Sequence, residues 1–314
     1  MGSMRYWAAR VCVVVITSVG LVAAVACGGA SEFPADAVPP TASQPAPQPS
    51  AGGGAPVRIA LASSDLSVGP NRVVLGLIEP DAGPIVNARV QVSTFFIEGG
   101  SQEGPIETVS AEFRKWPVFG GVYTVGLEFD RAGAWGLVVE GVEPDGATLQ
   151  STLSVTVRET SRTPAVGAAA PPSLTKTASD AANLGEITSD TDPDPELYAT
   201  TIADALRAGR PLLVAFSTPA YCQTATCGPQ LDVVKELKAQ YRDRVSFIHV
   251  EMFDNPDEIQ GDLSRARTVP AAAEWNLPSE PWTFVVDAEG LVAAKFEGFA
   301  TRDELEEALA KVLP

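Results

Sequence analysis

The fold of the C-terminal half is decided by a short apolar run and a pair of cysteines, Pro211-Leu-Leu-Val-Ala-Phe216 followed by Cys222-Gln-Thr-Ala-Thr-Cys227-Gly228-Pro229. The apolar run is typical of a strand buried on both faces of a sheet. Apolar residues then recur at helical spacing as far as Tyr241. At a strand-to-helix turn the backbone N–H groups point outward and the helix dipole favours a thiolate. The pattern therefore indicates thiol–disulfide chemistry at Cys222 and Cys227.

The N-terminus accounts for the other two of the four cysteines. Residues Val11 to Ala26 are mostly apolar and follow a short basic start, which is typical of a secretory signal and too short for a spanning helix. The end of this run, Ala24-Val25-Ala26-Cys27-Gly28, resembles the lipobox of bacterial lipoproteins. The resemblance implies that Cys12 is removed and that Cys27 becomes the lipidated first residue. The alternative is an ordinary cleavage site with an incidental Cys27.

Lipoprotein processing would leave Cys222 and Cys227 as the only pair of thiols, in an oxidising compartment that favours a disulfide between them. We therefore expect an extracytoplasmic protein, lipid-anchored at the face of the bacterial membrane through several acyl chains. The formal net charge is −17 and no basic patch offsets it. This charge argues against nucleic acid and anionic headgroups as partners.

Composition divides the chain into five segments. Residues 28–56 are rich in Ala, Pro, Ser, Gln and Gly, so they bury too little apolar surface to fold and predict a disordered stalk. The segments are a signal peptide (1–27), the stalk (28–56), an all-β domain (57–159), a linker rich in Pro, Ala, Thr and Ser (160–194) and an α/β domain (195–314).

Period-two alternation and regular turn signals predict an Ig-like β-sandwich in the all-β domain. Its expected strands are Val57–Leu61, Arg72–Ile78, Arg89–Phe96, Glu107–Phe113, Val122–Phe129, Trp135–Glu140 and Leu149–Arg158. The pair Gly121-Val-Tyr123 and Ala132-Gly133-Ala-Trp135 resembles the Ig-like modules of bacterial copper-resistance proteins. However, residues 57–159 contain no His, Cys or Met, which excludes a soft-metal site built from those ligands. We expect a spacer or partner-binding module.

The C-terminal domain alternates helices and strands. Its expected elements are helix Glu196–Ala208, strand Leu212–Phe216, a helix ending at Tyr241, strand Val245–Glu251, a hairpin of Trp282–Asp287 and Leu291–Glu297, and helix Arg302–Leu313. Together with Cys227-Gly-Pro229 and Glu280-Pro281-Trp-Thr-Phe-Val-Val-Asp-Ala-Glu-Gly290, this order resembles the thioredoxin fold, including membrane-tethered extracytoplasmic thioredoxins. The resemblance implies a cis peptide bond before Pro281. It also places Tyr221, Glu280 and Pro281 in a substrate groove beside the cysteines.

The cysteine motif is an atypical C-x4-C-G-P, whereas thioredoxins place two residues between their cysteines. Two alignments stay open: Cys222 takes the nucleophile position, or Cys227 does and Gln230 replaces the second cysteine. The resemblance also implies a buried Asp where this chain has Ala215. Glu280 would raise the pKa of a nearby thiol by like-charge repulsion.

These observations favour thiol–disulfide exchange with a protein partner, with Cys222 as nucleophile and Cys227 as resolving thiol. The alternative is a non-catalytic adaptor that binds an envelope partner and keeps a structural disulfide. A third hypothesis is Cu(I) handling, because His249, the only histidine, completes a soft ligand set with the two cysteines. Since His249 lies within an expected strand, a packed sheet residue is the preferred interpretation. No cofactor is implied.

Overall fold

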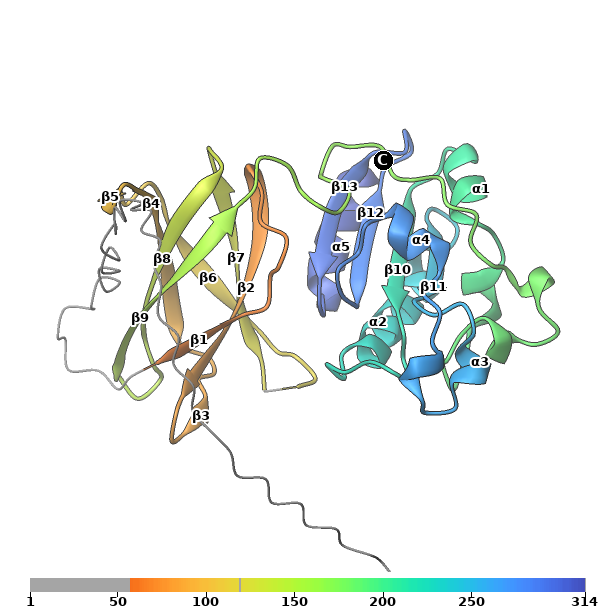
Figure 1. Ribbon diagram of the computed structural model, residues 1–314, viewed down its shortest axis with the longest axis horizontal. Coiled ribbons are helices and arrows are strands. Elements are labelled where there is room, and N and C mark those ends of the chain that lie inside the picture. The colour runs from red at the N-terminus through yellow and green to blue at the C-terminus, as the bar shows by residue number, and fades with distance from the viewer. Residues whose placement is uncertain (1–56, 119, 314) are drawn as a thin grey trace, which may run out of the picture. The chain divides into compact units, whose positions relative to one another are not determined.

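The computed structural model describes residues 57–118 and 120–313 (Figure 1). The predicted signal peptide, Cys12, Cys27 and the stalk at 28–56 lie outside the described residues, so lipidation stays a prediction. Within the described residues, no helix is both long and apolar enough to cross a membrane. The described residues all belong to one compact unit by their contacts.

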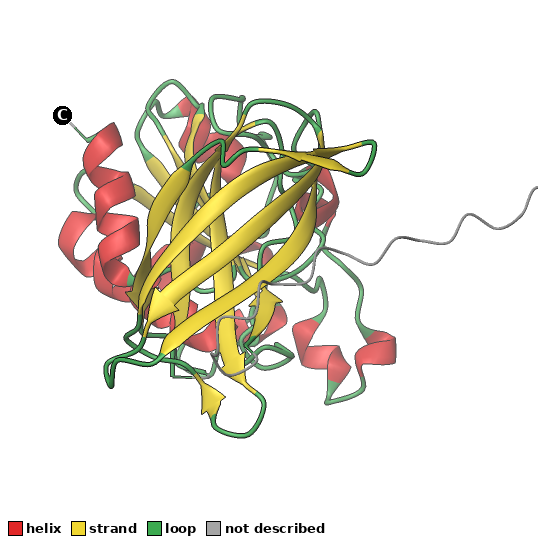
Figure 2. Cartoon of the chain, turned by 90° about the vertical axis from the view of Figure 1, so that its left-hand side faces the viewer, coloured by secondary structure: helices red, strands yellow, loops and turns green. Residues whose placement is uncertain are grey.

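The N-terminal part of this unit is entirely β. Its strands are β1 (Arg58–Leu61), β2 (Gly69–Glu79), β3 (Gly83–Pro84), β4 (Arg89–Glu98), β5 (Ser101–Glu103), β6 (Thr108–Arg114), β7 (Val122–Phe129), β8 (Gly133–Val142) and β9 (Thr148–Val157). They form one antiparallel sheet in the order β1-β2-β7-β6-β4-β8-β9, with β3 on β2 and β5 on β4. Figure 2 shows strands of this sheet facing the viewer, in yellow. The first half of β6 pairs with β4 and the second half with β7, so the sheet folds over on itself at β6.

The all-β character predicted from the alternation is confirmed, and the Ig-like classification stays a prediction. The two strands that the sequence did not indicate, β3 and β5, are short hairpin partners. Trp135 is fully buried and packs edge-on against Phe96 and Phe129. The buried Tyr123 hydroxyl accepts from Ala88 N and donates to the Ile85 carbonyl. Both aromatic residues therefore belong to the core, as large buried rings with satisfied polar atoms usually do.

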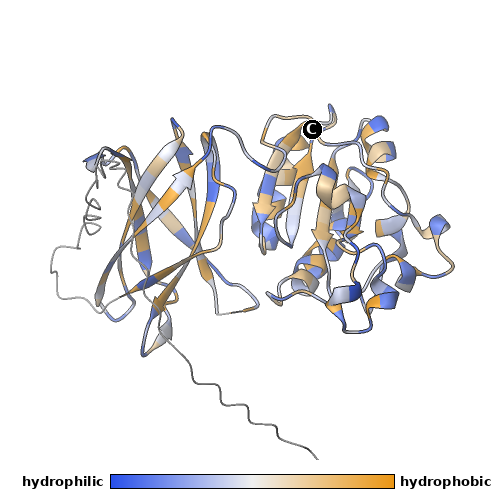
Figure 3. Cartoon of the chain, in the orientation of Figure 1, coloured by the Kyte–Doolittle hydropathy of each residue, from blue (hydrophilic) through white to orange (hydrophobic). Residues whose placement is uncertain are grey.

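The C-terminal part is a four-stranded sheet with helices on both faces (Figures 1 and 3). Its strands are β10 (Leu212–Ser217), β11 (Ser246–Glu251), β12 (Trp282–Val286) and β13 (Val292–Glu297), and its α-helices are α1 (Ile202–Arg207), α2 (Cys227–Tyr241), α3 (Pro256–Ile259), α4 (Pro270–Glu274) and α5 (Arg302–Val312). The sheet order is β11-β10-β12-β13, and only β10 and β11 are parallel to each other. Successive residues of β10 point to opposite faces, so Leu213 packs with α2 and α5 while Val214 packs with α1 and α4.

The predicted extent of the helix at 196–208 was wrong. The structure has a short 3₁₀ turn, η3 (Pro195–Tyr198), and then α1 beginning at Ile202. The Thr201 side chain accepts from Asp204 N and caps α1, which ends any continuity with the turn before it. Two further 3₁₀ turns, η1 (Ala178–Asp180) and η2 (Leu184–Glu186), lie in the segment predicted as a linker, and η4 (Leu263–Arg265) follows α3.

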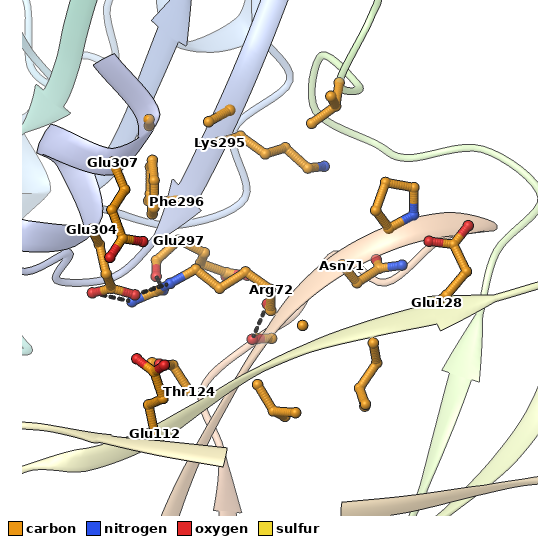
Figure 4. Close-up of a pocket in the computed structure, with 18 of the residues that line it drawn as sticks. Asn71, Arg72, Glu112, Thr124, Glu128, Lys295, Phe296, Glu297, Glu304 and Glu307 are labelled. Carbon is orange, nitrogen blue, oxygen red and sulfur yellow. Dashed lines mark hydrogen bonds and ion pairs between the residues drawn. The ribbon is translucent and has the colours of Figure 1, made fainter. Parts of the chain in front are cut away.

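Charged side chains connect the all-β module to the α/β domain. Arg72 on β2 donates to both carboxylate oxygens of Glu304 on α5, at 2.8 and 3.1 Å (Figure 4). Asp65 is buried and pairs with Lys295 on β13 at 3.0 Å. Asp65 also accepts from residues at the start of the linker, among them Arg162 N and Thr163 N. The module is therefore fixed to the domain by buried ion pairs.

Candidate functional site

The two cysteines form a disulfide between the end of β10 and the start of α2, with their Cα atoms 6.0 Å apart. Cys227 is the first residue of α2 and is completely buried. Cys222 is partly exposed, and its Sγ lies 3.2 Å from the Thr224 hydroxyl. The two cysteines therefore differ in exposure, and Cys222 is the one that a partner molecule can contact.

Two consecutive turns bring the widely spaced cysteines together. The first is closed by Tyr221 N donating to the Thr218 carbonyl, and the second by Ala225 N approaching the Cys222 carbonyl at 3.5 Å. Ala225 has a φ of 56°, a left-handed conformation that is uncommon for a residue with a Cβ. These turns take up the four intervening residues and deliver Cys227 at the helix N-terminus, where the helix dipole favours a thiolate.

Tyr221 connects the cysteine loop to the neighbouring α3 segment. Its hydroxyl donates to the Pro256 carbonyl at 2.9 Å, and its ring lies edge-on to Phe253. Both contacts hold the residue that immediately precedes Cys222. The predicted groove residue thus has a supporting role in this structure, while its ring stays partly exposed.

Pro281 and Glu280 lie at the same end of the sheet as the cysteine loop. Trp282, the first residue of β12, pairs with Phe216 near the end of β10, and the Glu280–Pro281 peptide bond is cis. Pro281 is buried, and its carbonyl accepts from Gly298 N at 2.9 Å. The structure therefore brings this turn and both cysteines to one end of the sheet.

Glu280 is a partly buried carboxylate that forms no hydrogen bond or ion pair with any other residue in the described part of the chain. Desolvation by burial raises its pKa. In its ionised form it would place an uncompensated negative charge at the cysteine end of the sheet. Such a charge disfavours a thiolate there.

His249 is a packed sheet residue, as the preferred interpretation of the sequence had it. Its Nδ1 lies 2.7 Å from the Tyr198 hydroxyl, and its Nε2 lies 2.9 Å from the Ser217 hydroxyl. Burial lowers the pKa of His249 to about 4. Because both ring nitrogens have partners, neither is free for a metal. Within residues 57–118 and 120–313, no cluster of His, Cys, Asp and Glu is arranged to hold an ion.

A buried carboxylate that no sequence pattern indicated lies beside the cysteine loop. Glu251, at the end of β11, accepts from Ser189 N at 2.8 Å and from the Ser189 hydroxyl at 2.7 Å. The same hydroxyl accepts from Ala220 N at 3.2 Å, two residues before Cys222. Burial raises the pKa of Glu251. Only the fold reveals this connection, because Ser189 is separated from Glu251 by 62 positions.

Gln230, which replaces the second cysteine in one of the two alignments, has a structural role. It is fully buried on α2, and its side-chain oxygen accepts from Ala300 N at 2.6 Å. It therefore joins α2 to the start of α5. The contact accounts for the side-chain oxygen at this position, while the buried amide nitrogen has no hydrogen-bond partner among the described residues.

A cavity of about 630 Å³ lies elsewhere, between the all-β module and the α/β domain (Figure 4). Its lining includes Arg72, Lys295, Glu297 and Glu304. None of the described cysteine-site residues lines it. Two ion pairs cross it, Arg72 with Glu304 and Lys295 with Asp65, and no cysteine lies in its lining.

Residues 198–313 match the thioredoxin-like domain family. Comparison with curated proteins gives no match. Among solved structures, a putative thiol:disulfide interchange protein DsbE from Chlorobium tepidum aligns with 36% of this chain and 85% of its own, at 15% identity and a TM-score of 0.30. CopC from Methylosinus trichosporium OB3b aligns with 32% of this chain and 94% of its own, at 15% identity and a TM-score of 0.23. The thioredoxin-like assignment rests on the family match, and with the disulfide it supports a thiol–disulfide-related function.

Proposed function

We propose that the protein exchanges disulfides with a protein partner through Cys222 and Cys227, at the extracytoplasmic face of a bacterial membrane to which lipid on Cys27 anchors it. The observation that carries the proposal is the unequal access of the sulfurs. Cys222 is partly exposed, and Cys227 is buried at the start of α2. An exposed attacking sulfur with a shielded second sulfur five positions away is the arrangement that exchange requires.

In the reducing direction, the Cys222 thiolate attacks one sulfur of a substrate disulfide, and the other substrate sulfur leaves as a thiolate. The Cys227 thiolate then attacks the Cys222 sulfur. The second substrate thiolate departs, and the Cys222–Cys227 disulfide remains. The substrate gains two electrons and the protein loses two. The reverse sequence oxidises a dithiol substrate, and the relative reduction potentials select the direction.

The charge around the site tunes this chemistry toward slow attack at neutral pH. Glu280 has no cation beside it among the described residues, and Ala215 is fully buried on β10 without a carboxylate. A carboxylate close to a thiol disfavours its thiolate, so an ionised Glu280 would slow attack by Cys222. We expect the exchange rate to rise with pH until the thiol is ionised.

The test is a trap for the mixed disulfide. With Cys227→Ser, the second step is blocked, and a covalent complex through Cys222 should accumulate on non-reducing gels of membrane extracts. With Cys222→Ser, the buried Cys227 should capture nothing, which makes this variant the matched control. Capture by neither variant, or by Cys222→Ser alone, would contradict the assignment of Cys222 as nucleophile.

The second candidate is an adaptor with a structural disulfide, which the missing buried acid at Ala215 favours. Closing so short a loop stabilises the folded state by only about 2 kcal/mol in the loop-entropy description. A reduction potential below about −300 mV, together with no insulin reduction, would support the adaptor, since structural disulfides resist reduction. Mass spectrometry of the mature N-terminus tests the anchor separately. It should find acyl chains on Cys27.

A further inference from the structure

Three residues of the all-β module meet one short segment of the α/β domain, Glu297 to Phe299 at the end of β13. The Ser64 backbone N donates to the Glu297 carboxylate at 2.7 Å, and its hydroxyl donates to the same carboxylate. Arg72 donates to the Glu297 and Phe299 carbonyls at 3.2 and 3.1 Å. Trp116 packs edge-on against Phe299, with ring centroids 6.0 Å apart.

This segment lies directly beside the turn that holds Glu280 and Pro281. Glu297 pairs with Trp282 in the sheet, and its carboxylate also accepts from the Ser279 hydroxyl at 3.1 Å. Gly298 N donates to the Pro281 carbonyl. The segment that the module contacts is therefore itself bonded to the turn at the cysteine end of the sheet.

Packing around Trp116 makes the module a fixed neighbour of this turn. Trp116, Val74, Val122 and Phe299 form a buried cluster, and Val233 on α2 packs against it. A Cβ added to Gly298 would lie 3.1 Å from the Trp116 ring, so the indole rests on the backbone itself. Trp116 is 8% exposed, whereas Lys115 and Pro117 on either side of it are exposed.

We propose that the loop residues Lys115 to Pro117 form one side of the surface that binds the protein substrate, so that an extended segment bearing the reacting cysteine contacts both this loop and the Glu280–Pro281 turn. The inference rests on the proposed exchange function and names its substrate class as polypeptides. A small dithiol needs only access to Cys222. A polypeptide that runs along the turn meets the module as well.

The first experiment compares a polypeptide with a small reagent on the full chain. Trp116→Ala removes the ring that holds the loop against Gly298 and Phe299, so we expect kcat/KM with insulin to fall about tenfold, the scale of one lost hot-spot contact. The reaction of the disulfide with dithiothreitol should keep its rate. Glu140→Ala, on the exposed side of β8, is the control and should leave both reactions unchanged.

Trp116 also supports the interface, so a second variant and a direct contact measurement remove the ambiguity of misfolding. Lys115→Glu alters only an exposed side chain and should change the insulin rate without changing thermal unfolding. In the Cys227→Ser mixed disulfide with insulin, an amine-reactive cross-linker should join Lys115, the sole lysine of residues 57–159, to insulin. Lys115→Arg should abolish that cross-link.

The outcomes separate this inference from the proposed function. If the wild-type chain neither reduces insulin nor forms a mixed disulfide with it, the exchange function fails. If the wild type reacts but both loop variants keep the insulin rate and Lys115 gives no cross-link, exchange stands and the role of the loop is overturned. An equal loss of the insulin and dithiothreitol rates in Lys115→Glu would also overturn it, because small reagents do not need the loop.

Discussion

Two buried carboxylates of the α/β domain lie in opposite environments. Glu304 faces the all-β module, where burial alone would raise its pKa but the charge and hydrogen bonds of Arg72 outweigh that effect and lower it. Glu251 lies at the cysteine end of the sheet, where burial raises its pKa and only hydroxyl and amide donors face it. Similar burial, at 7% and 3% exposure, therefore has opposite electrostatic results.

The difference separates the face of the domain that contacts the all-β module from the end that carries the disulfide. At the module interface the buried carboxylates Glu304 and Asp65 have counter-charges, Arg72 and Lys295. At the cysteine end, Glu251 and Glu280 have none among the described residues. The paired charges hold the two parts together. The unpaired carboxylates have no cation to keep them ionised, so their protonation depends on their surroundings.

The largest effect is expected from removing the ion pair between Arg72 and Glu304. Arg72→Met leaves Glu304 buried without its cation and removes two donors to main-chain carbonyls, so the free energy of unfolding should fall by about 3–5 kcal/mol. Urea denaturation measures this change. The control is Arg207→Met, which removes an exposed i,i+3 pair with Asp204 and should cost less than about 1 kcal/mol. An equal loss of unfolding free energy in the two variants would mean that the interface pair stabilises the fold no more than an exposed pair does.

A smaller effect concerns the pH dependence of the paired carboxylate. Because the folded pKa of Glu304 lies below its unfolded value of about 4.5, its stabilising contribution is present above that pH and is lost as the pH falls through the folded pKa. Glu304→Gln should lower the free energy of unfolding at pH 7 by about 2–3 kcal/mol. The deficit should shrink in acid. A deficit that is the same at pH 7 and pH 3 would contradict the lowered pKa.

The smallest effect has the opposite sign. The folded pKa of Glu251 lies above about 4.5, so its favourable contribution is present below that pH and is lost as the pH rises through the folded pKa. Glu251→Gln should remove this loss and change the free energy of unfolding at neutral pH by about 1 kcal/mol or less. Thermal unfolding from pH 4 to 8 should show a flatter profile for the variant. An unchanged slope would show that Glu251 titrates normally.

Local sequence patterns predicted most elements of the fold because burial imposes a period on the chain. The run at 212–216 is buried on both sides, and the alternation in the all-β module places its apolar residues in one core. Patterns failed where a local polar contact interrupted a regular element. The Thr201 cap that begins α1 is such a contact, and apolar spacing carries no information about it.

The candidate site was predictable only in part. Its cysteines, Pro281 and Glu280 were identified because the types and order of residues resemble those of a known fold. Glu251, Ser189 and Gln230 were missed, since each acquires its role from a residue brought close by folding. The relative access of the two sulfurs was also open. It depends on Cys227 starting a helix and Cys222 lying in the turn before it.

The sequence by itself pointed to thiol–disulfide-related chemistry, because a pair of cysteines after a buried strand reflects local order and composition. It also determined the division into an all-β module and a thioredoxin-like domain. Tertiary structure decided which sulfur is reachable, how Glu251 and Glu304 come to titrate in opposite directions, and where the module meets the turn at Pro281. Those properties come from contacts between residues as far as 233 positions apart, such as Ser64 with Glu297. Contacts over such separations produce no repeating pattern of apolar residues in the sequence.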